Sequence, residues 1–229
     1  MVLSLPDVAA LGFFLAAWVS YSLAVRVGLM HREGLNHSMD QYRIRWMEEM
    51  ARRDVRMVDS SIMASLQNGA AFFTSTSLIA IGGTATMLRA TDDMLKIFAE
   101  ASMGLVADRV LWELKIIGLL VIFGYAFFKF AWAYRLFNFT AILIGATPAR
   151  ADPDAAGREA MVRRAARMNI AAGAHFTRGQ RALFFALAYF GWFLGPWAFM
   201  ATTLAVIAVM AARQFRSDAR RALEDDAPA

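Results

Sequence analysis

Two basic residues, Lys129 and Arg135, lie in an otherwise apolar segment and are the first residues whose type and position suggest chemistry. Ionisable groups inside a membrane span are costly and often mark a transport path or a buried ion pair. A lysine or arginine near the end of a span can instead extend its charge to the lipid headgroups. Lys129 and Arg135 are therefore candidate intramembrane charges, and we expect a structural role for them before a functional one.

A second basic group consists of His175, Arg178 and Arg181, which follow one another at intervals of three residues. On one helix these side chains project to neighbouring positions. A guanidinium group can bind phosphate oxygens through two parallel hydrogen bonds. We expect the three residues to contact the headgroups of anionic lipids, and the alternative is that they only follow the positive-inside tendency of membrane proteins.

Small and polar residues recur at helical spacing in one apolar segment, and a Gly-x-x-x-Gly pattern occurs in another. Such residues either line a hydrated path or let two helices approach closely, and packing is the commoner use. The predicted packing residues are Ser61, Ser65, Asn68, Ser75, Gly82, Gly191 and Gly195.

Most enzyme classes have no support in the sequence. The chain has no cysteine, and its three histidines have no partner at the spacing of metal ligands. Its serines and glycines form neither a nucleophile turn nor a phosphate-binding loop. We therefore expect no catalytic residue, no metal and no cofactor. The net charge of +5 and a pI near 10.0 do not predict nucleic-acid binding, because the basic residues lie between apolar segments.

The composition predicts a membrane protein, since 59% of the 229 residues are hydrophobic, 19% are charged and the mean hydropathy is +0.43. We expect one all-α membrane domain, a bundle of about four transmembrane helices. The predicted spans are residues 6–27, 62–88, 112–146 and 182–212, and the third is either one helix or a helix with a break. The last span contains Gly195-Pro196, so it is either one kinked helix, which we favour, or a hairpin that returns to the same side.

Two further helices are predicted between the spans, an amphipathic one over residues 38–59 and a polar one over residues 153–176. Both are rich in arginine, which places them on the cytoplasmic side of a bacterial inner membrane. Four crossings would then leave both chain ends outside. Arg213, Arg216, Arg220 and Arg221 disagree with this arrangement, because they prefer the inside.

Several runs of residues resemble a bacterial membrane-protein family known as domain of unknown function 599, and the resemblance extends over most of the chain. The runs are Gln41-Tyr42-Arg43-Ile44-Arg45-Trp46-Met47, Phe72-Phe73-Thr74-Ser75-Thr76, Phe127-Phe128-Lys129-Phe130-Ala131-Trp132, His175-Phe176, and Trp192-Phe193-Leu194-Gly195-Pro196-Trp197. The resemblance implies a protein of the inner membrane with several spans, and it transfers no catalytic residue.

Two functions follow from these features. The first is a non-catalytic inner-membrane protein that binds anionic lipid headgroups, a protein partner or a second copy of itself. The second is a small transporter or channel for an ion or small solute, indicated by Lys129, Arg135 and the polar stripe. We favour the first, because between Ile62 and Ala212 every acidic residue lies in a loop except Glu113, which is near the end of a span.

Overall fold

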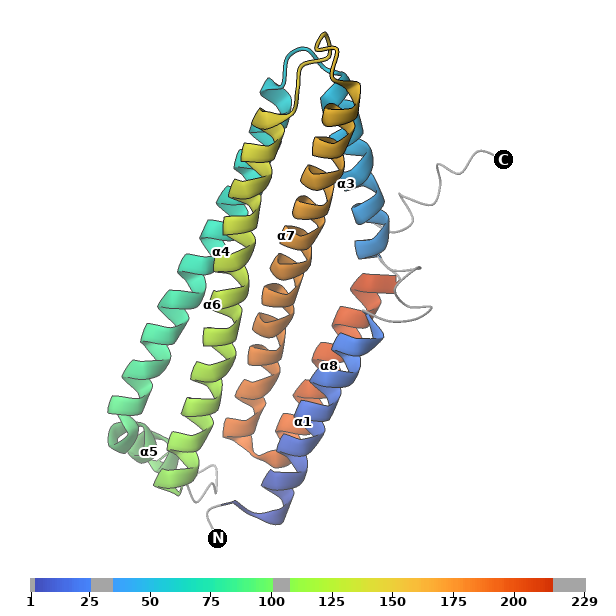
Figure 1. Ribbon diagram of the computed structural model, residues 1–229. Coiled ribbons are helices and arrows are strands. Elements are labelled where there is room, and N and C mark those ends of the chain that lie inside the picture. Colours follow the sequence, from blue (N-terminus) through green and yellow to red (C-terminus); the bar gives the residue numbers. More distant parts are fainter. Residues whose placement is uncertain (1–2, 26–34, 101–107, 216–229) are drawn as a thin grey trace. The chain divides into compact units, whose positions relative to one another are not determined.

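The computed structural model describes residues 3–25, 35–100 and 108–215. These residues form seven α-helices and one short 3₁₀ helix, with no strand in the described ranges, so the prediction of an all-α protein is confirmed (Figure 1).

Four helices are long and apolar enough to cross a membrane, in agreement with the predicted number. They are α1 (Leu5–Ala24), α4 (Met57–Arg89), α6 (Arg109–Ala146) and α8 (Pro196–Phe215). Helix α1 begins with Ser4 as its N-cap and Pro6 in its first turn, as the sequence indicates. Positions 26 and 27 of the first predicted span lie outside the described residues. Helix α6 continues through Lys129 as one helix, which decides between the two alternatives that the sequence left open.

The predicted helix over residues 38–59 is wrong in its extent, because α3 (Leu35–Arg52) ends before α4 begins. Asp59, in the first turn of α4, explains this chain reversal. Its Oδ1 accepts hydrogen bonds from Trp46 Nε1 at 2.8 Å and Arg53 Nη1 at 2.7 Å. A buried carboxylate at a helix N-terminus is also favoured by the helix dipole, so α4 starts where Asp59 is held.

The favoured kinked helix over residues 182–212 is also wrong. Helix α7 (Ala155–Phe190) ends in the 3₁₀ helix η1 (Gly191–Leu194), and Gly195 has a φ of 126°, which an L-residue rarely adopts. The chain then returns as α8, since Thr202 Oγ1 donates a 2.7 Å hydrogen bond to the carbonyl of Ala188 on α7. The two helices form a hairpin, the alternative that the sequence left open.

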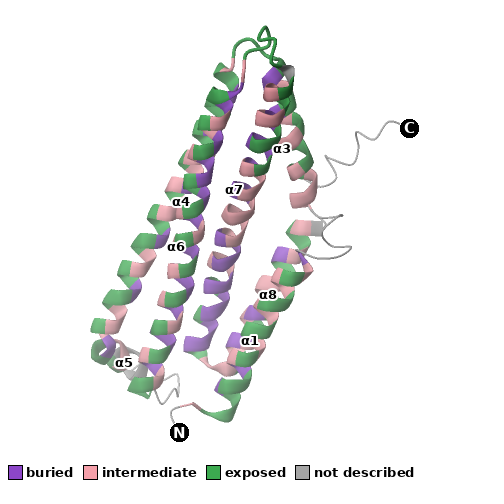
Figure 2. Ribbon diagram, in the orientation of Figure 1, coloured by how far each residue is buried: buried purple, intermediate pink, exposed green. Residues whose placement is uncertain are grey.

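The chain divides into two compact units. Unit 1 comprises Met1–Leu35, Ser77–Tyr125 and Arg181–Ala229, and unit 2 comprises Asn36–Thr76 and Ala126–Gln180. The core of unit 1 is rich in aromatic residues: Phe14 meets the rings of Phe185, Tyr189 and Phe199 at centroid distances of 4.9–5.6 Å. The core of unit 2 contains Met47, Met50 and Met63 with many alanines. Figure 2 shows the buried positions as continuous faces along α6 and α7.

Contacts within unit 1 fix the directions of its helices. Near one end, Asp7 of α1 binds Trp192, and toward the other end Trp18 stacks on Phe185 at 4.8 Å. Helix α1 is therefore antiparallel to the C-terminal part of α7. Helix α8 is also antiparallel to α7, because the two form a hairpin. Helix α6 has the direction of α1, since Lys115 contacts Trp192 and Tyr125 contacts Trp18.

Candidate functional site

Three basic residues of unit 2 form a cluster: Lys129 of α6 with His175 and Arg178 of α7. The ring of His175 lies edge-on to Trp132 at 6.5 Å, and its Nδ1 is buried with no hydrogen-bond partner. Burial first, and then the positive charges of Lys129 and Arg178, lower the pKa of His175 below its usual 6.5. The structure thus brings together residues that the sequence assigned to two separate sites.

The third member of the predicted lipid site, Arg181, belongs to unit 1. Its side chain is buried, with 8% of the residue exposed, and the guanidinium lies 5.4 Å from the ring centre of Tyr21 on α1. This is the geometry of a cation–π contact, which is stronger when the cation is shielded from water. Arg181 therefore differs from Arg178, because its guanidinium already packs against Tyr21 of α1.

Arg135, the other candidate intramembrane charge, is exposed on α6. Its guanidinium lies 5.8 Å from the ring centre of Trp132 and 5.4 Å from that of Phe139. Both rings belong to the same helix, one turn before and one turn after the arginine. The arrangement shields an exposed cation locally, as expected for a structural role.

The predicted stripe of α4 faces away from the neighbouring helices of the chain. Ser61, Ser65, Asn68, Ser75 and Gly82 are all exposed. After Asp59, the buried positions of α4 follow a different line, at intervals of seven residues: Met63, Ala70, Ser77 and Thr84. The stripe is thus not the face on which α4 packs within the chain, and contact with another chain stays a prediction.

The two glycines of the Gly-x-x-x-Gly pattern lie in and just after the η1 turn, with different roles. A Cβ at Gly191 would collide with the Thr202 hydroxyl and come within 3.0 Å of the Ala198 carbonyl oxygen, so this glycine permits the close approach of α8. Gly195 has no atom within 4 Å of its Cβ position and is instead required by its positive φ.

A buried polar cluster in unit 1 was not recognised in the sequence. Trp192 Nε1 donates to Asp7 Oδ1 at 2.8 Å, and Lys115 Nζ donates to the Trp192 carbonyl oxygen, also at 2.8 Å. Asp7 and Lys115 are only 5% and 8% exposed. Both charged side chains are therefore shielded inside unit 1. The available signal was the lone acid in the first apolar segment, because a buried carboxylate needs a partner.

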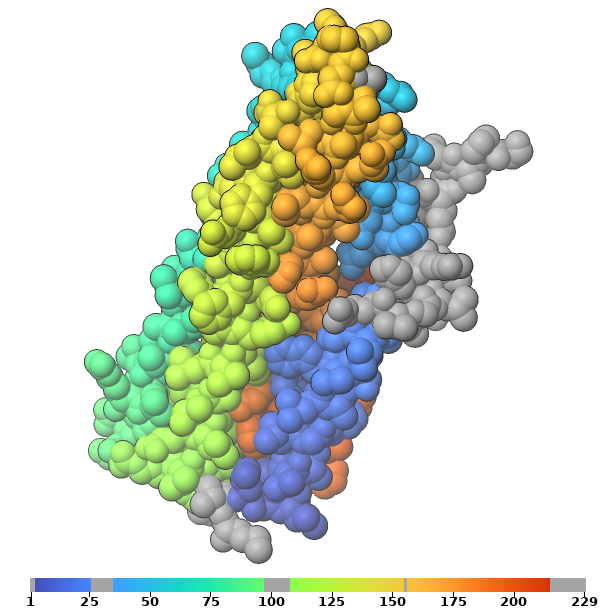
Figure 3. Space-filling model, in the orientation of Figure 1, coloured from blue at the N-terminus to red at the C-terminus, as the bar shows by residue number. Residues whose placement is uncertain are grey.

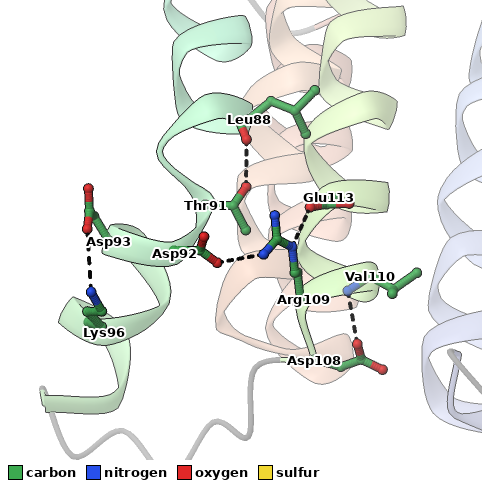
Figure 4. Close-up of polar contacts among 9 residues, drawn as sticks. All are labelled: Leu88, Thr91, Asp92, Asp93, Lys96, Asp108, Arg109, Val110 and Glu113. Atoms are coloured by element: carbon green, nitrogen blue, oxygen red, sulfur yellow. Dashed lines mark hydrogen bonds and ion pairs between the residues drawn. The ribbon is translucent and has the colours of Figure 1, made fainter.

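Arg109 joins the short helix α5 (Thr91–Glu100) to the start of α6 in unit 1 (Figure 4). Its guanidinium binds Asp92 of α5 at 2.9 Å and Glu113 of α6 at 2.9 Å. Arg109 and Asp92 are largely exposed and Glu113 is partly exposed, so the contact is a surface ion-pair network and contributes little to stability. It marks the acidic end of unit 1, where α1 and α6 begin.

Metal binding has no support in the part of the chain that the structure describes, where no group of three or more histidine or acidic side chains could hold an ion.

Comparison with known proteins gives one finding. No curated protein and no solved structure matches the chain. A family profile described as "Protein of unknown function, DUF599" matches residues 9–219. The chain therefore belongs to this family of proteins of unknown function, as the sequence resemblance indicated.

Proposed function

We propose that the protein is a non-catalytic integral protein of the bacterial inner membrane that binds anionic phospholipid. The observation that carries this proposal is the basic cluster of Lys129, His175 and Arg178, in which the charges acting on His175 are both positive. Such a cluster attracts an anion, and a lipid phosphate accepts several charge-assisted hydrogen bonds at once. The Nδ1 of His175 supplies a further polar group that lacks a partner.

The position of Arg178 along α7 supports a lipid phosphate as the anion. Arg178 precedes Arg181 by three residues, about 4.5 Å along the helix axis. Arg181 in turn contacts Tyr21, which lies three residues before the end of α1. Helix α1 has 20 residues and is about 30 Å long, the thickness of the hydrocarbon core. The end of α1 is therefore at headgroup level, and so is Arg178.

The orientation of the chain agrees with an inner-membrane location. In this orientation helices α1, α6 and α8 cross in one direction, and α4 and α7 cross in the other, so the C-terminal part of α7 adds a fifth crossing to the four candidate spans. The acidic end of unit 1 then faces outward. The arginine-rich helix α3 and the start of α7 face the cytoplasm, and so does Arg213, one of the arginines that disagreed with four crossings.

The fifth crossing is the C-terminal part of α7, which is absent from the four candidate spans because the uncharged part of this helix after Arg181 is short. One face of this part is buried inside unit 1, where Ala182, Phe185, Ala186 and Tyr189 are at most 3% exposed, and Leu187 is exposed on the opposite face. Because Arg181 is shielded by Tyr21, its charge is compatible with the end of a membrane segment. Burial and the apolar residues after Arg181 thus support a membrane segment here.

The test uses the full chain in nanodiscs that contain equal amounts of phosphatidylglycerol and phosphatidylethanolamine, and it measures bound lipid by native mass spectrometry. We expect the wild type to retain phosphatidylglycerol preferentially, and Lys129→Gln/Arg178→Gln to lose this preference. The control Arg52→Gln/Arg163→Gln removes the same charge from exposed ion pairs and should retain it. Equal retention by the two double variants would refute the headgroup site.

A transport function is the second candidate, and one observation favours it: Asp7 is a buried carboxylate inside a candidate span. Its hydrogen bonds to Ser4 and Trp192 indicate a structural carboxylate. Proteoliposomes that contain the protein would decide this question through their proton permeability. We expect the same permeability as in empty vesicles, and a leak that Asp7→Asn abolishes would support transport.

A further inference from the structure

A groove of about 610 Å³ in unit 1 lies between α1 and α6. Phe14, Tyr189 and Trp192 are buried by 97% or more and form its floor. Its walls come from the two helices: Leu11, Leu15, Trp18, Val19, Ser22 and Leu23 of α1, and Leu114, Ile117, Gly118, Val121, Ile122 and Tyr125 of α6. In Figure 3, orange and red atoms of the C-terminal part of the chain are visible between the blue α1 and the green start of α6.

The length of the groove equals the depth of one lipid leaflet. The lining residues of α1 extend from Leu11 to Leu23, about 18 Å along the helix axis, and those of α6 extend from Leu114 to Tyr125, about 16 Å. The hydrocarbon core of a bilayer is about 30 Å thick, so one leaflet is about 15 Å deep. A single acyl chain that runs parallel to α1 therefore has the right length.

The lining is suited to hydrocarbon and not to water. Ser22 has the one aliphatic hydroxyl among the lining residues, and the remaining polar groups are those of tyrosine and tryptophan. A water molecule needs two to four polar partners, which this surface does not offer along its length. Leu15, Val19 and Val121 are 52%, 56% and 66% exposed, so the groove is open on its outer side, where a chain can enter from the bilayer.

The two ends of the groove differ. At the end where α1 and α6 begin, Trp192 is held on both sides by Asp7 and Lys115, and its fixed ring limits the groove. At the other end, the guanidinium of Arg181 lies on Tyr21 and that of Arg213 lies 5.6 Å from the ring centre of Phe184. Positive charge is therefore present where a headgroup would lie, and an apolar wall is present where the chain would end.

We propose that this groove seats one acyl chain of a phospholipid, whose methyl end lies toward Trp192 and whose phosphate lies at the Arg181 end. The lipid comes from the leaflet in which α1 ends. The inference rests on the proposed membrane location and lipid binding, but it depends on the shape of unit 1 and not on the basic cluster of unit 2. Leu11, Phe14 and Val121 select for a hydrocarbon chain, whatever the headgroup.

The first test compares two matched substitutions in detergent-purified protein, with retained phospholipid counted by native mass spectrometry. Val121→Trp fills the groove, whereas Val209→Trp makes the same change at a valine of α8 that is 49% exposed and outside the groove. We expect Val121→Trp to retain one phospholipid fewer per chain than the wild type and Val209→Trp to retain the same number. Equal numbers in the two variants would overturn the proposal.

The second test needs no folded variant. The wild type is reconstituted with phospholipid brominated on one acyl chain and is then transferred into a large excess of unbrominated lipid. A seated chain should leave residual quenching of tryptophan fluorescence, because Trp18 and Trp192 line the groove. Complete recovery at the rate of bulk lipid exchange would contradict a seated chain.

The two lipid proposals can fail separately in these experiments. If only the headgroup site exists, Lys129→Gln/Arg178→Gln loses phosphatidylglycerol preference while Val121→Trp retains every lipid. If only the groove exists, Val121→Trp loses one lipid of either headgroup while the double glutamine variant keeps its preference.

Discussion

The indole N–H of Trp192 donates a 2.8 Å hydrogen bond to the carboxylate of Asp7, a residue 185 positions earlier in the chain. The bond connects the first turn of α1 to the turn between α7 and α8, and Lys115 holds the same tryptophan through its carbonyl oxygen. Three segments of unit 1 thus meet at one buried residue, Trp192. A polar cluster with so little exposure should contribute to stability only as long as every member keeps its partner.

Asp7→Ala should therefore lower the melting temperature in detergent. The substitution leaves the Trp192 indole N–H without its acceptor and Lys115 without a nearby negative charge, at a cost of about 1–3 kcal/mol. Asp7→Asn keeps an acceptor oxygen and should be less severe. The control is Asp93→Ala, which removes an exposed carboxylate 3.8 Å from Lys96 and should change little. Equal melting temperatures for Asp7→Ala and Asp93→Ala would argue against a structural role for the cluster.

The five crossings proposed above would place the two ends of the described chain on opposite sides of the membrane. Because the chain has no cysteine, each introduced cysteine is a unique label site. With an impermeant maleimide on intact cells, we expect Lys96→Cys to be labelled, and Arg52→Cys, Arg163→Cys and Gln214→Cys to be protected until the membrane is opened. Labelling of Gln214→Cys in intact cells would restore four crossings, and labelling of Arg52→Cys or Arg163→Cys would overturn the orientation.

The C-terminal end of α6 depends on one arginine of unit 2. Arg56 donates hydrogen bonds to the carbonyl oxygens of Ile144, Thr147 and Pro148 at 2.6–3.0 Å. Ile144 lies in the last turn of α6, and Thr147 and Pro148 directly follow its end, so Arg56 binds the chain where helical hydrogen bonding stops. A cation at this end is also favoured by the helix dipole.

Arg56→Ala should accordingly lower the free energy of unfolding by about 1.5–3 kcal/mol, the range for hydrogen bonds to charged groups. Arg56→Lys should recover part of the loss, because an ammonium group cannot reach three carbonyls with the geometry of a guanidinium. Denaturation by a graded detergent series would measure both, with Arg52→Ala as the exposed control. If Arg56→Ala and Arg52→Ala unfold at the same detergent concentration, Arg56 does not cap α6.

Local patterns in the sequence predict the apolar spans, because twenty uncharged residues in a row have few alternatives to a membrane helix. The same patterns do not decide between a kink and a hairpin at Gly195-Pro196, which permits both. What decides it is Thr202 bound to the carbonyl of Ala188, a contact between two helices. The pairing of Asp7 with Trp192 could not be predicted for a similar reason, because no local sequence pattern connects two residues that are so far apart in the chain.

The structure groups the predicted site residues differently from their spacing in the sequence. The three-residue spacing on one helix predicted that His175 and Arg178 act together with Arg181. Lys129, which acts on His175 in the structure, lies on another helix, so no spacing could reveal it. The stripe that begins at Ser61 shows the same limit. Its members do share one face of α4, but this face is exposed. Which face of a helix is buried depends on the neighbouring helices, and the spacing within one helix does not reveal them.

The pH dependence of stability should reveal the state of His175. Its pKa is lowered, so the unfolded chain binds a proton more readily than the folded protein does. The stability due to the neutral ring is present above the unfolded-state pKa of about 6.5 and is lost as the pH falls from there toward the lower folded-state pKa. In neutral detergent, the wild type should thus lose more stability between about pH 7.5 and about pH 5.5 than His175→Gln does. His37→Gln serves as the control for removal of a histidine elsewhere.

Anionic lipid should weaken this pH dependence if the basic cluster binds phosphate. A phosphate beside His175 favours the charged ring and opposes the effects of burial, Lys129 and Arg178 on its pKa. Thermal unfolding in micelles with and without phosphatidylglycerol would measure the difference, and the loss at low pH should shrink in the wild type while His175→Gln stays unchanged. By linkage, phosphatidylglycerol should also bind more tightly at about pH 5.5 than at about pH 7.5. The same affinity at both pH values, together with equal pH profiles of the wild type and His175→Gln, would show that His175 does not face the bound phosphate.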